Sequence, residues 1–342
     1  MGNDLSKPPA HYFNYLLEDD DEDEEEEDMI IENLLKRKSK ASNKEIYRKK
    51  NRNSPEHEDP KQSVWWKNYM ESPKLDNKKF FKKFRLRFRL PYQQFLQLVE
   101  QISVHDMFIR WHPGRKNGAG KPTSPLSLLL LGSLRYLGRG LTMDDLEEYT
   151  NINEEVHRVF FHVFIRYGSS VMYNKYVHYP KNSNECKIHG KEFDIAGMHG
   201  CIGSMDGVHV VMEKCEHRLR QFHLGPKLKH TSRGYNVTVN HRRRILSCTS
   251  GHPARWNDKT LLMYDYFAMS IMNGELQDYE FELYENSDTM KKYTGVWIVV
   301  DNGYLLWPIL MPPVKNTSSR KAIRWSEWVE SMRKDVECKF GI

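Results

Sequence analysis

The stretch GCIGSMDGVHV, at residues 200–210, is the part of the chain that decides its fold. Apolar and small residues lead up to Asp206, and Val208–Met212 continues with residues that favour strands. Further along, VWIVV at residues 296–300 is fully apolar, which is typical of a short buried strand, and Asp301 follows it directly. We therefore expect two buried strands of one sheet, the first closed by Asp206 and the second by Asp301.

The segments around these strands complete a mixed pattern. The alternation in YNVTVN, at residues 235–240, predicts a further strand, and Ile245–Ser250 follows a turn rich in arginine. Residues 258–273 have helical spacing, and Ser319–Phe340 predicts a long final helix. Strands, helix, strand and helix in this order indicate an α/β domain with a mixed sheet over residues 181–342.

Acidic residues occur where such a sheet builds sites. The carboxyl ends of neighbouring strands meet at one edge, where we expect Asp206 and Asp301, and Glu337 lies on the final helix. A carboxylate after an apolar strand is costly to bury unless it binds a cation, and its oxygens suit Mg²⁺ or Mn²⁺. Two such ions activate water for phosphodiester cleavage. Asp258 is a candidate fourth acid or an alternative second one, although its position suits a helix cap equally well.

Residues 63–180 predict helices rather than strands. The first, Lys78–Arg89, places phenylalanines at helical spacing among seven cations that face water or phosphate. Further helices are expected at residues 92–104 and 124–137, and Thr142–Asp145 has the pattern of a capping box.

A helix, a tight turn and a second helix follow at residues 142–167, which is the outline of a helix-turn-helix unit. Arg158 and Arg166 recur on one face of the second helix, where they would contact DNA. Glu154 and Glu155 at the start of that helix would repel phosphates, so plain helical packing is the alternative.

The charge of the chain is strongly divided. Its formal net charge is +6, but residues 18–28 carry 11 negative charges, which leaves the rest of the chain at +17. A basic body of this size indicates a polyanionic partner such as nucleic acid, with a solvated surface as the alternative. Residues 1–62 are expected to be disordered, because blocks of like charge bury too little apolar area. The basic block Lys36–Arg52 is either a nuclear localisation signal or solvated tail.

Cysteine use and hydropathy exclude other classes. The 5 cysteines are sparse, and no signal-peptide pattern opens the chain, which predicts reduced thiols in the cytosol or nucleus. The longest apolar stretch, around Leu126–Leu134, is far short of the ~20 residues that span a bilayer, so no membrane protein is expected. Cys186, His189, His199 and Cys201 are of zinc-ligand type, but their spacing fits no standard zinc finger.

Two groups of cations adjoin the expected acidic site. Arg242, Arg243 and Arg244 follow His241 on a predicted hairpin turn, and Arg324 lies on the final helix. Both groups either hold DNA phosphates beside the acids or are simply solvated.

Five blocks of the chain, taken together and in order, point to one family. GCIGSMDGVHV, YNVTVN, GHPARWNDKTLLMYDYF, VVDNGYLLWPILMPP and RKDVECKFGI resemble the blocks of Harbinger-type (plant transposon protein) transposases, over roughly residues 85–342. The resemblance implies a ribonuclease H-like domain with a DDE acid triad. The matching residues are Asp206, Asp301 and Glu337, with 35 residues between the last two.

The same resemblance implies a function. It implies a nuclear, metal-dependent transposase that cuts DNA at terminal inverted repeats, transfers the strand and works with a Myb-like protein of the same element. In the family the last helix continues past FGI into a basic segment, whereas this chain ends at Ile342, five residues after Glu337. Because terminal turns fray, we expect weak binding of Mg²⁺ or Mn²⁺ and poor cleavage. A domesticated or relic DNA-binding protein without catalytic activity is the alternative.

Overall fold

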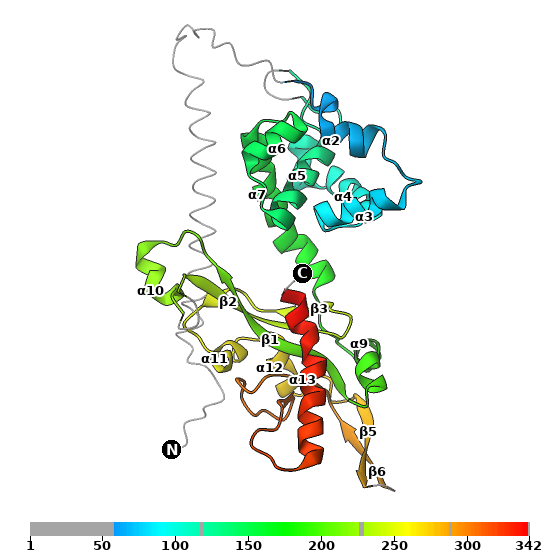
Figure 1. Ribbon diagram of the computed structural model, residues 1–342, viewed down its shortest axis with the longest axis vertical. Coiled ribbons are helices and arrows are strands. Elements are labelled where there is room, and N and C mark those ends of the chain that lie inside the picture. Colours follow the sequence, from blue (N-terminus) through cyan, green and yellow to red (C-terminus); the bar gives the residue numbers. More distant parts are fainter. Residues whose placement is uncertain (1–57, 117–119, 226–228, 287–288, 341–342) are drawn as a thin grey trace.

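The computed structural model describes a helical unit followed by a mixed α/β unit (Figure 1). The described residues are 58–340, apart from 117–119, 226–228 and 287–288. The acidic run and the basic block of the expected disordered tail lie outside this described part. The described chain begins with a 3-10 turn, η2 (Pro60–Gln62), which Asp59 caps and which precedes the expected start of order by a few residues.

The helices of the helical unit surround one aromatic core. In chain order they are α2 (Val64–Trp66), the π-helical η3 (Lys67–Glu71), α3 (Lys78–Phe88), α4 (Tyr92–Ser103), the 3-10 helix η4 (Asp106–Trp111), α5 (Leu126–Arg139), α6 (Met143–Thr150) and α7 (Glu154–Tyr167). The fully buried side chains include Phe84, Phe88, Phe95, Phe108 and Phe160. The phenylalanines expected to pack from α3 therefore do so, while its lysines and arginines are exposed.

Helices α5 and α7 meet closely at Gly132 and His157. A β-carbon on Gly132 would lie 2.7 Å from ring atoms of His157, so this packing requires glycine. His157 is buried, its Nε2 lies 2.8 Å from the Thr150 hydroxyl, and burial lowers its pKa to about 4. The histidine is therefore neutral inside the core at physiological pH.

Helices α6 and α7 have the outline of a helix-turn-helix unit. The expected capping box is present, because Thr142 Oγ1 accepts from the Asp145 backbone N–H and the Asp145 carboxylate accepts from the Thr142 backbone N–H. Asn151 ends α6 in the left-handed conformation with a φ of 54°, and the Asn153 side chain caps α7. The capping box and the tight turn expected from the sequence are therefore confirmed.

Helix α7 does not end with the helical unit. It continues through one π-helical segment, η5 (Gly168–Met172), into α8 (Tyr173–Tyr176). Ser170 Oγ donates to the Arg166 carbonyl at 2.7 Å within this segment. The Tyr173 hydroxyl donates to the Cys248 carbonyl at 2.8 Å, so the end of this helix contacts the sheet of the α/β unit.

The α/β unit contains a mixed sheet, as expected. Its strands are β1 (Cys201–Val211), β2 (Ser232–Val239), β3 (Ile245–Cys248), β4 (His252–Pro253), β7 (Trp297–Val299) and β8 (Leu310–Met311). The order is β3-β2-β1-β7-β8, with β4 paired to β2. Strands β1, β2 and β3 are antiparallel, whereas β1, β7 and β8 are parallel. One edge of the sheet is therefore a meander and the other is built by crossovers.

Helices cover both faces of this sheet. Helix α13 (Arg320–Phe340) packs Val329 and Met332 against Cys201 and Val299, and Figure 1 shows it lying across the sheet. On the other face, α12 (Tyr266–Met272) packs against β1 and β7. The remaining elements are α9 (Ser183–Ile195), η6 (His217–Leu219), α10 (Arg220–His223), α11 (Asp258–Leu262) and the hairpin β5 (Glu280–Asn286) with β6 (Thr289–Thr294).

Two expectations about these elements are wrong. Asp206 does not close β1, because the strand continues to Val211 through antiparallel pairing with β2. The helix expected at residues 258–273 is two helices, since the buried carboxylate of Asp265 accepts from the backbone N–H groups of Phe267 and Ala268 and starts a new helix there. In the described part of the chain, every helix is too short or too polar to cross a bilayer.

Candidate acidic site at the edge of the sheet

The strand register places Asp206 and Asp301 side by side. Ser204 of β1 pairs with Val299 of the parallel strand β7, and each aspartate lies two residues further along its own chain. Side chains two residues apart share a face, and neighbouring strands lie roughly 4.8 Å apart. The two carboxylates therefore occur together where β7 ends and β1 continues, although only Asp301 follows the end of a strand.

Asp258 joins these two acids. A β-carbon on Gly303 would lie 2.9 Å from Asp258 Oδ2 and 3.0 Å from Asp301 Oδ1, so both carboxylates approach the same point. A β-carbon on Gly207 would lie 2.8 Å from Asp258 Oδ1. The two glycines therefore leave room for carboxylate oxygens. We call Asp206, Asp258 and Asp301 the acidic site.

The helix-cap alternative for Asp258 is wrong. The cap of α11 is Asn257, whose side chain accepts from the Thr260 backbone N–H at 2.9 Å, and Asp258 is the first residue of the helix. The Asp258 carboxylate is thus directed toward the glycines of the acidic site instead of toward the helix end.

The surroundings of Asp206 disfavour its charged form. Burial raises its pKa to about 6, and the nearby charges of Asp301 and Asp258 raise it as well. Arg333 and the Gly207 backbone N–H, which donates to Asp206 Oδ1 at 2.9 Å, act in the opposite direction. The carboxylates are therefore close enough to repel one another, and a cation among them would relieve this repulsion.

Arg333 of α13 contacts Asp206 of the acidic site. Its Nη1 donates to Asp206 Oδ2 at 3.2 Å, and its Nη2 lies 2.7 Å from Glu337 Oε1 and 3.2 Å from Glu330 Oε2. Burial lowers the pKa of Arg333, but Asp206, Glu337 and Glu330 outweigh this and raise it. Among the expected triad, Glu337 is thus connected to Asp206 through Arg333, and its side chain is 47% exposed.

A buried polar network lies near the acidic site, and it was not expected from the sequence. The Tyr304 hydroxyl donates to Asn236 Oδ1 at 2.6 Å, and Asn236 Nδ2 donates to Asp265 Oδ2 at 2.6 Å. Burial raises the pKa of Tyr304 well above its ordinary value, and Asp206, Asp258 and Asp301 raise it further. The only sequence signal was the occurrence of polar residues inside otherwise apolar segments.

The cations expected to hold phosphate are mostly paired with acids of the protein. On the turn between β2 and β3, Arg243 and His241 contact Asp335 of α13, and Arg242 contacts Glu192 of α9. In the following position, Arg244 Nη2 lies 3.0 Å from His178 Nε2.

The same holds in part for the helical unit. Arg158 forms ion pairs with Glu154 and Glu155 of its own helix, at 3.7 and 2.6 Å. Arg166 of α7 and Arg324 of α13 are exposed. DNA contact by these residues stays a prediction.

Cysteine and histidine side chains do not form a second site in the described part of the chain. Cys186 and Cys201 are buried, and burial raises the pKa of the Cys186 thiol to about 12. His189 Nδ1 lies 3.1 Å from Asn240 Nδ2, and His199 contacts Asp194 at 3.4 Å. Within the described residues, no group of three or more His, Cys, Asp or Glu side chains is already arranged as ligands of one ion.

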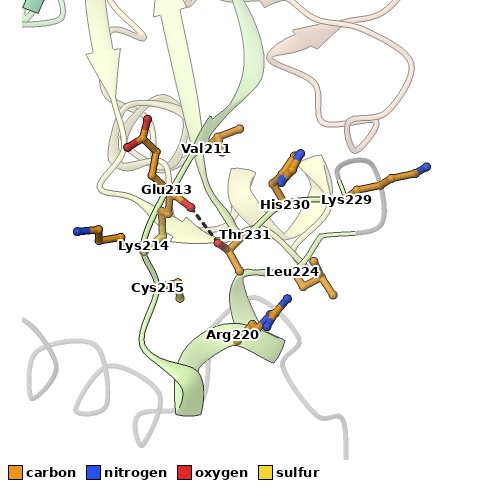
Figure 2. Close-up of a pocket in the computed structure, with 10 residues that line it drawn as sticks. Val211, Glu213, Lys214, Cys215, Arg220, Leu224, Lys229, His230 and Thr231 are labelled. Atoms are coloured by element: carbon orange, nitrogen blue, oxygen red, sulfur yellow. Dashed lines mark hydrogen bonds between the residues drawn. The ribbon is translucent and has the colours of Figure 1, made fainter. Parts of the chain in front are cut away.

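A cavity of about 690 Å³ lies at the far end of β1 and is separate from the acidic site. Figure 2 shows Arg220, Lys229 and His230 around it, and Thr231 Oγ1 donates to the Met212 carbonyl at 3.0 Å. Val211, which also lines it, is five residues from Asp206 along the strand, or roughly 17 Å. None of the three aspartates lines this cavity, so it is not part of the candidate site.

One comparison with known proteins bears on this geometry. Residues 174–342 match the family model described as plant transposon protein. Searches of curated proteins and of solved structures returned no match. The matched segment contains the whole mixed sheet, the acidic site and Arg333. The match therefore supports a transposon-related family and a transposon-derived origin for this chain.

Proposed function

We propose that residues 181–342 form a metal-dependent nuclease domain that cuts and joins DNA, with Asp206, Asp258 and Asp301 as the ligands of Mg²⁺ or Mn²⁺. The observation that carries this proposal is the approach of Asp258 and Asp301 to one point beside Gly303, level with Asp206 on the neighbouring strand. Carboxylate oxygens are the ligands that these hard cations prefer.

The fold supports a finer assignment within this proposal. We propose that the sheet is ribonuclease H-like, since an antiparallel meander, β3-β2-β1, continues into the parallel strands β7 and β8, and α13 crosses the acid-bearing part. In this assignment the acids lie just past the end of β7, where the central strand β1 continues without its parallel neighbour. The family match over residues 174–342 is consistent with such a domain.

In this proposal the residues of the site have distinct roles. When bound, the divalent cation would supply Lewis-acid stabilisation of the phosphate that is attacked. Asp206, Asp258 and Asp301 hold it, and Gly207 and Gly303 leave space for their carboxylates. Glu337 completes the DDE triad once Arg333 no longer occupies the position between it and Asp206.

The proposed substrate is duplex DNA at the terminal inverted repeats of a transposon, and the proposed location is the nucleus. A Myb-like protein of the same element is the proposed partner. These assignments rest on the resemblance of the five sequence blocks and on the family match.

One observation favours a second candidate, a DNA-binding protein without cleavage. Arg333 neutralises part of the acidic site, and Glu337 is half-exposed near the end of α13. In such a protein the acids would bind Arg333 permanently and would not take up a divalent cation.

The experiment is a Mn²⁺ titration by calorimetry together with a nicking assay on supercoiled plasmid, using the full chain. The nuclease proposal expects Mn²⁺ binding and Mn²⁺-dependent nicking, both lost in Asp206→Asn and retained in the control Asp278→Asn, whose carboxylate accepts from Ser183 away from the site. Mn²⁺ binding and nicking that are unchanged in Asp206→Asn would refute the site. Absence of Mn²⁺ binding in the unaltered chain would favour the second candidate.

A further inference from the structure

The helical unit carries a row of cations that have a different environment from those around the sheet. On α3, Lys79, Lys83 and Arg87 are spaced four residues apart and therefore lie on one face of the helix. On α5, Arg135 and Arg139 have the same spacing. We call these five residues the basic ridge. All are exposed except Arg135, which is half-buried.

Packing joins the two halves of the ridge. Arg135 Nη1 donates to the Arg87 carbonyl at 3.1 Å, so α5 contributes its arginines directly beside the end of α3. The Arg89 side chain packs against Gly138, where a β-carbon would lie 2.8 Å from Arg89 Cγ. Figure 1 shows both helices in the same part of the helical unit. The ridge is therefore one continuous surface.

The guanidinium groups of the ridge act on one another without a counter-ion. Burial lowers the pKa of Arg135, and the charges of Arg139 and Arg87 lower it further, while no carboxylate contributes. Within the described residues, none of the five ridge side chains forms an ion pair with an acid. Arg87 Nη1 donates to the buried Tyr69 hydroxyl at 2.6 Å, which fixes its position.

Such a row is unfavourable in the isolated protein. Like charges four residues apart on a helix repel each other, and the sequence of α3 offers no acid to alternate with them. Around the sheet, by contrast, Arg242, Arg243 and Arg333 each contact a carboxylate. The cations of the ridge are thus available to an external polyanion.

We infer that the basic ridge is the surface on which this protein binds the phosphate backbone of duplex DNA. Duplex DNA presents roughly one negative charge per 1.7 Å of its axis, and cations four residues apart on a helix are about 6 Å apart, so the row on α3 can contact several phosphates. The choice of DNA over other polyanions rests on the proposed function, whereas the location of the surface rests on the ridge alone.

The test measures binding of a non-specific DNA duplex to the full chain by fluorescence anisotropy, with a chelator present so that the acidic site does not contribute. The ridge variant is Lys79→Gln/Lys83→Gln/Arg139→Gln, which changes three exposed side chains. The matched control is Arg218→Gln/Lys291→Gln/Lys292→Gln, which removes the same charge from cations that already pair with Glu216, Glu285 and Glu280.

The ridge variant is expected to bind about 30-fold more weakly, with a salt slope shallower by about 3, because each lost phosphate contact removes one released counter-ion. The control is expected to lose less than about 3-fold. Replacement of the same three ridge residues by the other basic residue, Lys79→Arg/Lys83→Arg/Arg139→Lys, should bind as the unaltered chain does, which separates charge from folding. Equal losses in ridge variant and control would overturn the inference, as would tighter, ridge-dependent binding of an RNA duplex. Nicking is not measured here, so failure of the nuclease proposal leaves this result unaffected.

Discussion

The helical unit and the α/β unit differ in where they place charged side chains. The helical unit leaves the cations of α3 and α5 on its surface and buries His157 in neutral form. The α/β unit brings Asp206 and Arg333 into its interior, where their side chains are 20% and 13% exposed. Under the proposals above, the first arrangement would serve an external polyanion and the second a small cation. The comparison teaches that net charge alone does not locate a nucleic-acid surface, because paired cations are already neutralised.

The largest expected effect concerns the neutral histidine of the helical unit. In the folded protein His157 stays neutral down to about pH 4, whereas in the unfolded chain it takes up a proton near pH 6.5. Unfolding is therefore accompanied by proton uptake between these values, and stability is lost as the pH falls through this window. His157 should contribute a loss of about 3 kcal/mol in the free energy of unfolding between pH 7 and pH 4.

Urea unfolding of the unaltered chain and of His157→Gln at several pH values checks this contribution. The variant lacks the titrating group, so its disadvantage should shrink by the stated amount as the pH falls. Parallel pH profiles for the two proteins would show that His157 is not held neutral.

The next effect concerns the space beside the acids. Gly303→Ala would place a methyl group about 3 Å from oxygens of both Asp258 and Asp301, which must then separate. If the site is catalytic, Mn²⁺-dependent nicking should fall on the order of 100-fold, as expected for ligands moved by about 1 Å. Gly168→Ala is the matched control, because nothing lies within 4 Å of the added β-carbon. Full nicking by Gly303→Ala would mean that the acids do not act from this arrangement.

A smaller effect is expected at Arg333. Arg333→Gln removes the cation that contacts Asp206 and Glu337, so the metal-free protein should lose about 2 kcal/mol of stability in urea. The freed carboxylates should bind Mn²⁺ about 10-fold more tightly, because the cation no longer competes with the guanidinium. Arg324→Gln, on the exposed side of the same helix, should change neither quantity. Unaltered Mn²⁺ affinity in Arg333→Gln would show that arginine and metal do not share a position.

The smallest effect is expected for the acidic run at residues 18–28, whose 11 carboxylates should compete with DNA phosphates for the cations of the protein. Its replacement by a neutral linker of equal length should tighten DNA binding about 3-fold at low salt, and high salt should remove the difference. Anisotropy titrations measure both. A change in affinity that does not depend on salt, or no change at all, would show that the acidic run does not compete with DNA for the basic ridge.

The sequence predicted most elements whose spacing was clear. Helices α3 to α7, strands β1, β2 and β7 and the long helix α13 were found from apolar periodicity and capping residues. Helix α9 was missed because its buried face consists of Cys186, His189, Gly190 and Phe193, of which only one is a large apolar residue. Gly190 is needed there, since a β-carbon would lie 2.8 Å from the Cys201 carbonyl.

The acidic site was only partly predictable. Asp206 and Asp301 could be placed together, because both follow apolar residues of strands expected in one sheet. The direction of the Asp258 side chain depends on Asn257 being the N-cap of α11. If the helix began one residue later, Asp258 would be the cap instead, and the sequence does not distinguish these two starts. The contact between Arg333 and Asp206 joins residues 127 positions apart, and no local sequence pattern predicts it.

The continuous helix from α7 through η5 to α8 has a mechanical consequence. Its segments of 14, 5 and 4 residues run from the aromatic core to the sheet, where the Tyr173 hydroxyl is hydrogen-bonded to the Cys248 carbonyl. Together they span roughly 35 Å at about 1.5 Å per residue. Because the helix is continuous, it fixes both the distance between the two units and their relative rotation. One inserted residue would turn one unit relative to the other by about 100°, and the π-helical turn at Gly168–Met172 sets the existing angle. If the basic ridge binds DNA and the acidic site acts on it, as proposed, the number of residues in this single helix sets the rotation of one surface relative to the other.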